Sequence, residues 1–204
     1  EHETAQPSQI RHYFELIQSS TVRLCKLVNE VLDLAKLEHG EHKFTLKRGD
    51  MRELLTRSAE SMQSLLKDKK IALRFDNPEA PVLAVCDHDK IVQVVTNLVQ
   101  NAQQALGDKA NGRVSVKLAR EQDKLVLTVN DNGPGIAPEM RGRLFEPYAT
   151  TKAEGTGLGL SIVERIVVEH GGEITAGDAP GGGASFVITL PLSGPTLLTE
   201  PPRD

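Results

Sequence analysis

The stretch Asp131-Asn132-Gly133-Pro134-Gly135-Ile136 follows a run of apolar residues, and Gly155-Thr156-Gly157-Leu158-Gly159-Leu160 comes after it in the chain. Further upstream, Asn97 and Asn101 stand four residues apart in a segment with helical apolar periodicity. The order is therefore an amide pair on a helix, an acidic glycine turn after a strand, and a glycine-rich segment that opens a helix. Each pattern alone is common, but the three in this order predict a nucleotide pocket, with ATP as its expected ligand.

Composition limits the remaining possibilities. The 204 residues, 39% of them hydrophobic, suffice for one domain of ordinary size with an appended element. A balance of 24 basic and 28 acidic residues gives a net charge of −4, so we expect no nucleic-acid partner. Cys25 and Cys86 lack the spacing of a disulfide framework or a metal site, which favours a reducing, cytoplasmic compartment. Because no apolar run approaches the ~20 residues of a membrane span and no signal peptide opens the chain, we expect a soluble protein without direct membrane contact.

Residues 1–40 predict a long helix that ends near Glu38-His39-Gly40, where the glycine can adopt a left-handed cap. Its apolar seam consists of Ile10, Phe14, Ile17, Thr21, Leu24, Val28, Val31 and Ala35, widened by Leu16, Leu27, Leu34 and Leu37. A stripe of this width, repeated over about four heptads, is typical of a four-helix bundle. A helix packed on its own domain is the alternative, and we consider the bundle the better interpretation.

The rest of the chain alternates helical and strand patterns. Asp50-Met51-Arg52-Glu53 indicates a capping box at the start of a helix, and Asp87 is the expected N-cap of another that ends near Leu106-Gly107. A further helix is expected from about Thr156 to His170, ended by Gly171-Gly172. The expected strands are Ile71 to Phe75, Val82 to Cys86, Val114 to Leu118 and Leu125 to Val129, the last two as a hairpin, and then Glu173 to Ala176 and Ser185 to Leu190. The tail from Ser193 has too little apolar content to pack, so we expect disorder in residues 193–204.

Four segments carry a family resemblance. Gln93 to Ala102 resembles the N-box of sensor histidine kinases, 131–136 the first glycine box, Leu144-Phe145-Glu146-Pro147-Tyr148 the F-box, and 155–160 the second glycine box. The resemblance covers about residues 50–192, and Thr150-Thr151-Lys152 is similar to the lid of kinases in the nitrogen-regulation branch. It implies an α+β protein: a two-layer α/β sandwich of the Bergerat ATP-binding fold over residues 41–192, preceded by the second helix of a dimerisation bundle.

The resemblance also implies a set of site residues. Those expected to contact the nucleotide are Asn97, Asn101, Asp131, Gly133, Gly135, Ile136, Arg143, Tyr148, Thr151, Lys152, Gly155, Thr156, Gly157, Leu158, Gly159 and Leu160. Independently of the family, an amide oxygen on Asn101 suits the octahedral shell of Mg²⁺, which also takes phosphate oxygens and waters. The Asp131 carboxylate can accept a hydrogen bond from the adenine amine, and a helix that opens with glycines directs free N–H groups at phosphates.

Three positions depart from the family pattern. Tyr148 stands where the family usually has Phe, and Ala184 replaces a hydroxyl residue. Gln104 occupies a position where many members carry a lysine that reaches phosphate, so Arg143 and Lys152 are expected to neutralise the phosphates instead. None of these changes breaks the predicted pocket.

The family's phosphoacceptor motif is absent. His12 precedes Tyr13-Phe14-Glu15 instead of the expected acidic and basic neighbours, His39, His42 and His88 look like surface residues, and His170 sits at a helix end that suits a cation. The chain therefore resembles a fragment that carries no catalytic histidine of its own and transfers the ATP γ-phosphoryl group to a histidine elsewhere, for relay to an Asp of a response regulator. The full protein would be a homodimer through its bundle helices and a candidate for anchoring in the bacterial inner membrane.

Two other functions remain open from the sequence. The first is an ATPase that clamps or dimerises on ATP; hydrolytic members of the superfamily carry a water-activating Glu where this chain has Asn97, and an amide cannot act as that base. The second is a nucleotide-binding module without turnover.

Overall fold

The computed structural model describes residues 7–38, 44–67, 69–152 and 155–195. The chain divides into two compact units, Glu1–His42 and Lys43–Asp204. In the first unit, α1 runs as one helix over Pro7–Glu38, as the apolar periodicity predicts. The predicted glycine cap at Gly40 lies outside the described residues.

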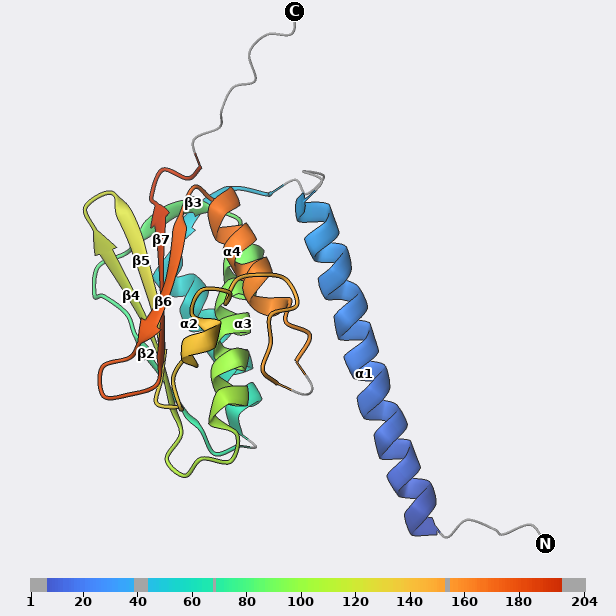
Figure 1. Ribbon diagram of the computed structural model, residues 1–204. Coiled ribbons are helices and arrows are strands. Elements are labelled where there is room, and N and C mark those ends of the chain that lie inside the picture. Colours follow the sequence, from blue (N-terminus) through green and yellow to red (C-terminus); the bar gives the residue numbers. More distant parts are fainter. Residues whose placement is uncertain (1–6, 39–43, 68, 153–154, 196–204) are drawn as a thin grey trace, which may run out of the picture. The chain divides into compact units, whose positions relative to one another are not determined.

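The second unit alternates helices and strands (Figure 1). Its elements are β1 Lys47–Asp50, α2 Met51–Lys67, β2 Ala72–Asp76, β3 Leu83–Cys86, α3 His88–Leu106, β4 Arg113–Glu121, β5 Lys124–Asp131, a 3₁₀ turn Pro138–Met140, α4 Gly159–Glu169, β6 Glu173–Asp178 and β7 Ala184–Pro191. No helix in the described part of the chain combines the length and apolar character that crossing a bilayer requires.

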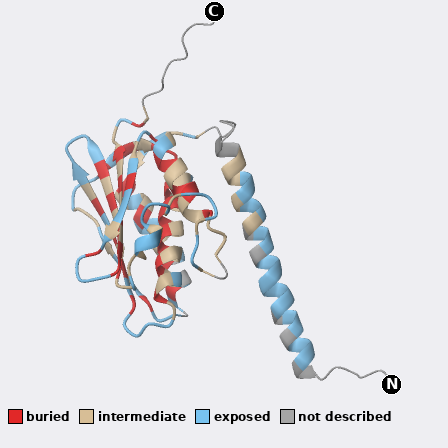
Figure 2. Ribbon diagram, in the orientation of Figure 1, coloured by how far each residue is buried: buried red, intermediate tan, exposed pale blue. Residues whose placement is uncertain are grey.

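The main sheet has five strands in the order β2-β4-β5-β7-β6. β2 pairs with β4 in parallel and the other pairs are antiparallel. Alternate residues of β5 are buried, from Leu125 to Asp131, because one face of the sheet is covered by α2, α3 and α4 (Figures 1 and 2). The predicted two-layer α/β sandwich is therefore confirmed.

Helix α3 begins and ends where the sequence predicts. The Asp87 carboxylate accepts from the Lys90 backbone N–H at 3.2 Å, and Gly107 closes the helix with its N–H on the Gln103 carbonyl. The inner face is apolar along its length, with Ile91, Val94, Val95, Leu98, Val99, Ala102 and Leu106 buried.

Several elements differ from the prediction. β1 was not predicted, because Lys-Arg-Gly-Asp has no apolar alternation; it pairs with β3 in a separate two-stranded sheet. Only the Asp50 half of the predicted capping box forms at the start of α2. The Asp50 carboxylate accepts from the Arg52 N–H at 3.0 Å, whereas the Glu53 carboxylate is paired with the Arg57 guanidinium at 3.6 Å. α4 begins at Gly159, three residues later than expected, because the glycines before it form part of a loop.

Two histidines are placed differently from the prediction. The sequence placed His170 at a helix end that suits a cation, but the side chain is 2% exposed, and burial lowers its pKa below the ordinary value. His88 is half-buried with its Nε2 inaccessible, because its ring lies over Gly49, where a methyl group would come within 2.5 Å of the ring. His39 and His42 lie outside the described residues.

The predicted tail begins with ordered contacts. The Leu192 carbonyl accepts from the Val85 N–H at 3.0 Å, and Gly194 is buried beside Val85. Gly194 thus lies against β3 and Pro195 lies beside Gly171, whereas residues 196–204 are outside the described range.

Candidate nucleotide site

Asp131 is the last residue of β5 and is 7% exposed. Its Oδ1 accepts from the backbone N–H groups of Gly133 at 2.7 Å and Ala184 at 3.2 Å. Every hydrogen bond that the described residues make to this carboxylate falls on Oδ1, which leaves Oδ2 as a fixed acceptor. Ala184 replaces a hydroxyl residue of the family, but its contact with Asp131 is made by the main-chain N–H and does not depend on the side chain.

The glycine turn is shaped by close backbone approaches. Gly135 has φ +82° and Gly183, on the β6–β7 turn, has φ +99°, values that favour glycine. A side chain on Gly183 would collide with the Asp131 carbonyl oxygen, and one on Gly133 would lie 2.8 Å from Asp131 Oδ1. Sequence reasoning missed Gly183, although the run Gly181-Gly182-Gly183 was a visible signal of a special turn.

Asn132 is held by a network that the sequence did not reveal. Its Oδ1 accepts from the Arg113 N–H at 2.7 Å and its Nδ2 donates to the Asn111 carbonyl at 3.1 Å. The Lys109 ammonium donates to the Asn132 carbonyl. These bonds tie the glycine turn to the loop between α3 and β4 and to the first residue of β4.

Residues 148–152, which include the lid Thr150-Thr151-Lys152, contact the second glycine segment. Gly157 has φ +70°, and a methyl group there would lie 2.5 Å from the carbonyl carbon of Tyr148. Tyr148, which stands where the family usually has Phe, has φ +65° and is 65% exposed, so its ring is not packed in the core. Gly155 lies beside Thr150, whose Oγ1 would be 2.6 Å from an added methyl group. Thr151 is exposed.

Lys152 connects the lid to α3. Its ammonium donates to Gln104 Oε1 at 2.8 Å and to the Asn101 carbonyl at 3.4 Å. The glutamine that replaces the expected lysine thus positions a lysine from the lid. Arg143 is placed differently: it is exposed and bonds to Glu146 at 2.7 Å, which raises the pKa of its guanidinium. A phosphate contact by Arg143 would have to compete with this pair.

Asn97 and Asn101 are half-buried on α3, one turn apart, so their side chains share a face. α3 packs against α4, whose first turn carries Gly159 and Leu160. Within the described ranges no three His, Cys, Asp or Glu side chains gather at one point as metal ligands. Mg²⁺ usually takes one or two protein oxygens and completes its shell with phosphates and water, so a single amide at Asn101 fits an ion that arrives with a nucleotide.

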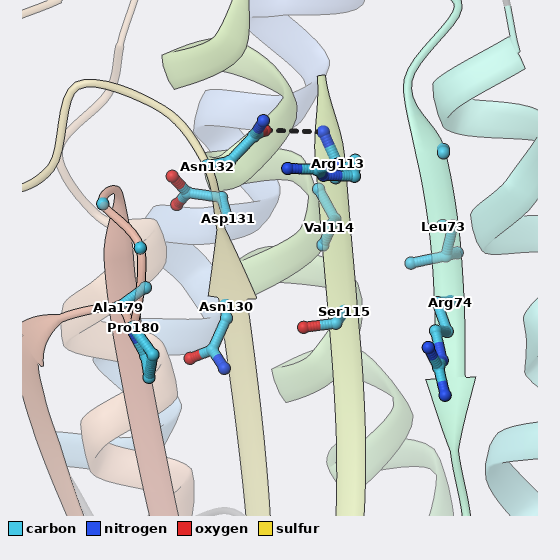
Figure 3. Close-up of a pocket in the computed structure, with 13 residues that line it drawn as sticks. Leu73, Arg74, Arg113, Val114, Ser115, Asn130, Asp131, Asn132, Ala179 and Pro180 are labelled. Carbon is cyan, nitrogen blue, oxygen red and sulfur yellow. Dashed lines mark hydrogen bonds between the residues drawn. The ribbon is translucent and has the colours of Figure 1, made fainter. Parts of the chain in front are cut away.

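A cavity of about 440 Å³ adjoins the acidic turn (Figure 3). It lies across β2, β4, β5 and the β6–β7 turn, and Asp131 and Asn132 line its upper part in this view. Arg74, Ser115 and Asn130 line it side by side, because they are paired in register on adjacent strands. The sequence did not suggest these residues.

The predicted site residues form two groups in the structure. Asp131, Gly133 and Gly135 lie together at the end of β5, with Ile136 next in the chain. Lys152, Gly155 and Gly157 belong to the lid group with Asn101, followed by Thr156, Leu158, Gly159 and Leu160 at the start of α4. The turn is linked to α3 through Leu106, whose side chain would be 3.7 Å from a methyl group on Gly133. Arg143 and the Tyr148 side chain stay outside both groups.

Comparisons with known proteins agree with this geometry. Residues 86–194 match the family described as histidine kinase-, DNA gyrase B- and HSP90-like ATPases. The sensor histidine kinase ZraS of Salmonella typhimurium is 39% identical over 172 residues, covering 83% of this chain and 36% of ZraS. The chain thus spans about a third of the length of this curated relative.

Two solved structures share the fold. Full-length ShkA in complex with AMPPNP superposes with a TM-score of 0.79 at 29% identity, over 94% of this chain and 40% of ShkA. The histidine kinase ThkA in complex with the response regulator TrrA gives a TM-score of 0.76 at 26% identity, over 94% of this chain and 54% of ThkA.

Proposed function

The chain belongs to the histidine kinase-, DNA gyrase B- and HSP90-like ATPase family, and on that premise we propose that it is the ATP-binding catalytic part of a sensor histidine kinase. The observation that carries the proposal is the buried carboxylate of Asp131, held by two backbone N–H groups with one oxygen left over. A fixed acceptor of this kind selects a ligand with an exocyclic amine, as adenine has.

The second half of the site suits a triphosphate. The glycines before α4 bring main-chain N–H groups and the positive end of the helix dipole to the lid. Lys152 brings a cation to the same place from the other side. These groups bind and orient the phosphates, and in phosphoryl transfer positioning and electrostatics supply most of the catalysis.

In the proposed reaction a neutral imidazole forms a bond to the γ-phosphorus while the bond to the leaving ADP oxygen breaks. The histidine is presented by another polypeptide segment, and the phosphoryl group then passes to an Asp of a response regulator. Asn97 disfavours the alternative ATPase, because an amide on α3 cannot take a proton from water.

Mg²⁺ is the cation we propose at Asn101. When bound, it would neutralise charge on the triphosphate. The chain's own part is to supply the Asn101 amide oxygen, oriented by a helix that Asp87 caps and by the lid contact of Lys152 with the Asn101 carbonyl.

We further assign residues 1–40 to the second helix of a dimerisation bundle, residues 41–192 to the catalytic domain and residues 193–204 to a tail. The exposed apolar residues of α1 support association with a second copy.

The ThkA complex with TrrA supports a response regulator as partner. The free thiols of Cys25 and Cys86 suit a cytoplasmic location.

The decisive experiment supplies the missing acceptor. The chain is incubated with γ-labelled ATP, alone and with a helix pair that bears the family's histidine motif, and acid-labile label is measured on each polypeptide. We expect label on the added histidine only. Phosphate released to water would instead indicate an ATPase, label on this chain would contradict an acceptor in trans, and binding without turnover would indicate a non-catalytic module.

The metal is tested separately. Asn101→Ala should abolish the increase in nucleotide affinity that Mg²⁺ provides and leave magnesium-free ADP binding nearly unchanged. Gln104→Ala, which removes a partner of Lys152, is the matched control and should keep its magnesium dependence. Equal magnesium dependence in Asn101→Ala and the parent chain would contradict the assignment.

A further inference from the structure

His170 makes two directional hydrogen bonds from inside the core. Its Nδ1 lies 2.7 Å from the Ile166 carbonyl, and its Nε2 lies 3.0 Å from the backbone nitrogen of Asp87. A carbonyl can only accept and a main-chain N–H can only donate, so Nδ1 carries the proton and Nε2 accepts. The ring is therefore neutral, in one tautomer, and joins the end of α4 to the start of α3.

Asp87 extends this junction to the beginning of the second unit. Its Oδ1 accepts from the Lys90 N–H at 3.2 Å and caps α3, whereas its Oδ2 accepts from the Thr45 N–H at 2.8 Å. Phe44 places its ring edge-on against His170, with centroids 4.8 Å apart. Phe44 and Thr45 are the first described residues after the long helix in the chain.

Each helix that meets at this junction also contributes to the nucleotide site. α4 carries Gly159 at its first position and is followed by His170. The beginning of α4 therefore belongs to the nucleotide site and its end belongs to the junction. α3 begins after Asp87 and carries Asn101 almost four turns further on. Because hydrogen-bonded helices move as rigid elements, a shift of α4 against α3 on ligand binding has to be accommodated at the His170–Asp87 bond.

We propose that His170 and Asp87 are positioning residues that couple nucleotide occupancy to the conformation of Phe44 and Thr45. The coupling rests on the nucleotide site proposed above. It connects Phe44 and Thr45, which follow the long helix in the chain, to α3 and α4, the two helices that carry residues of that site. Thermodynamic reciprocity then requires that, if bound nucleotide shifts the equilibrium between two conformations of Thr45 by some factor, the two conformations differ in nucleotide affinity by the same factor.

Thr45 allows the coupling to be tested without disturbing the core, because its side chain is exposed. Thr45→Pro removes the N–H that bonds to Asp87, whereas the matched control Thr45→Ala keeps it. We expect Thr45→Pro to change the Kd for AMPPNP with Mg²⁺ by at least about 5-fold, and Thr45→Ala by less than about 2-fold. Equal affinities in the two variants would overturn the coupling.

Hydrogen exchange of the Thr45 amide in the 204-residue chain gives the reciprocal measurement. Saturating AMPPNP should change its exchange rate in the parent chain. His170→Gln, whose amide oxygen can replace Nε2 as acceptor, should retain the change, and His170→Asn, which replaces only the Nδ1 donor, should lose it. A nucleotide-independent rate in the parent chain would overturn the coupling alone, whereas failure to bind AMPPNP would overturn the proposed function as well.

Discussion

α1 and α3 have the same kind of sequence pattern but different surroundings. In α3 the apolar stripe is covered by the sheet and the neighbouring helices, and Leu98 is 1% exposed. In α1 the corresponding stripe is open, with Ile17 62% and Phe14 69% exposed. Periodicity therefore indicates which face of a helix must be buried and leaves open what buries it. The ATP-binding unit contains the elements that cover the stripe of α3, whereas the partner that we propose for the stripe of α1 is a second copy of the chain.

The largest expected effect tests this contrast directly. Leu98→Ala should lower the free energy of unfolding by about 2–5 kcal/mol, because it removes packed apolar atoms and leaves a cavity. Ile17→Ala should change it by no more than about 0.5 kcal/mol, because that side chain is exposed in the monomer. Urea denaturation at a concentration where the chain is monomeric provides the comparison. Equal losses would show that α1 packs on its own domain, the interpretation we disfavour.

The next prediction tests whether Asp131 of the ATP-binding unit binds the adenine amine. Asp131→Asn should weaken ATP binding by about 1.5–3 kcal/mol, because it replaces a charged acceptor at the adenine amine. Its amide oxygen can still accept from Gly133 and Ala184, so the fold should persist. Calorimetric titration with ATP and GTP measures the change, and Asp178→Asn, at an exposed ion pair with Arg141, is the control. Unchanged ATP affinity in folded Asp131→Asn would remove Asp131 from the site.

His170 makes the stability of the ATP-binding unit depend on pH. Burial lowers the pKa of His170, against the opposing effects of its Ile166 hydrogen bond and the Asp87 and Glu169 carboxylates. As the pH falls below the ordinary value of about 6.5, the unfolded chain takes up a proton that the folded chain does not, so stability falls.

The slope of this loss is at most about 1.4 kcal/mol per pH unit, and it ends at the folded-state pKa. Urea midpoints between pH 7.5 and 5.5 should therefore fall in the parent chain and fall less in His170→Gln. His88→Gln is the control for histidine removal elsewhere. A parallel pH dependence in the parent chain and His170→Gln would show that His170 does not contribute.

The smallest effect concerns the two thiols, one in each region. Cys25 on α1 is exposed, whereas burial and the neighbouring Asp87 raise the pKa of Cys86 to about 12. Iodoacetamide at neutral pH should modify Cys25 and leave Cys86 intact until the protein unfolds. Peptide mass spectrometry separates the two sites, and faster modification of Cys86 in the native protein would contradict its placement in the core.

The sequence by itself determined the local features of this protein. The apolar stripe of α3, the cap at Asp87 and the order of the glycine segments follow from short-range rules, and each appears where it was expected. The family resemblance added the two-layer fold, which the structure confirms. Arg143 and Tyr148 were also chosen by resemblance, but the first is engaged with Glu146 and the second is largely exposed.

The tertiary structure decided what depends on residues distant in the chain. β1 forms by pairing with β3, and glycine is required at position 183 because the backbone there has φ +99° and approaches Asp131. His170 follows a helix end in the sequence like any solvated cation, yet the Asp87 N–H and the Phe44 ring, from segments more than 80 residues earlier, make it a buried neutral acceptor. Local propensities act over a few residues, whereas burial and hydrogen-bond partners are set by the packing of distant segments, so the role of such groups becomes visible only in the folded chain.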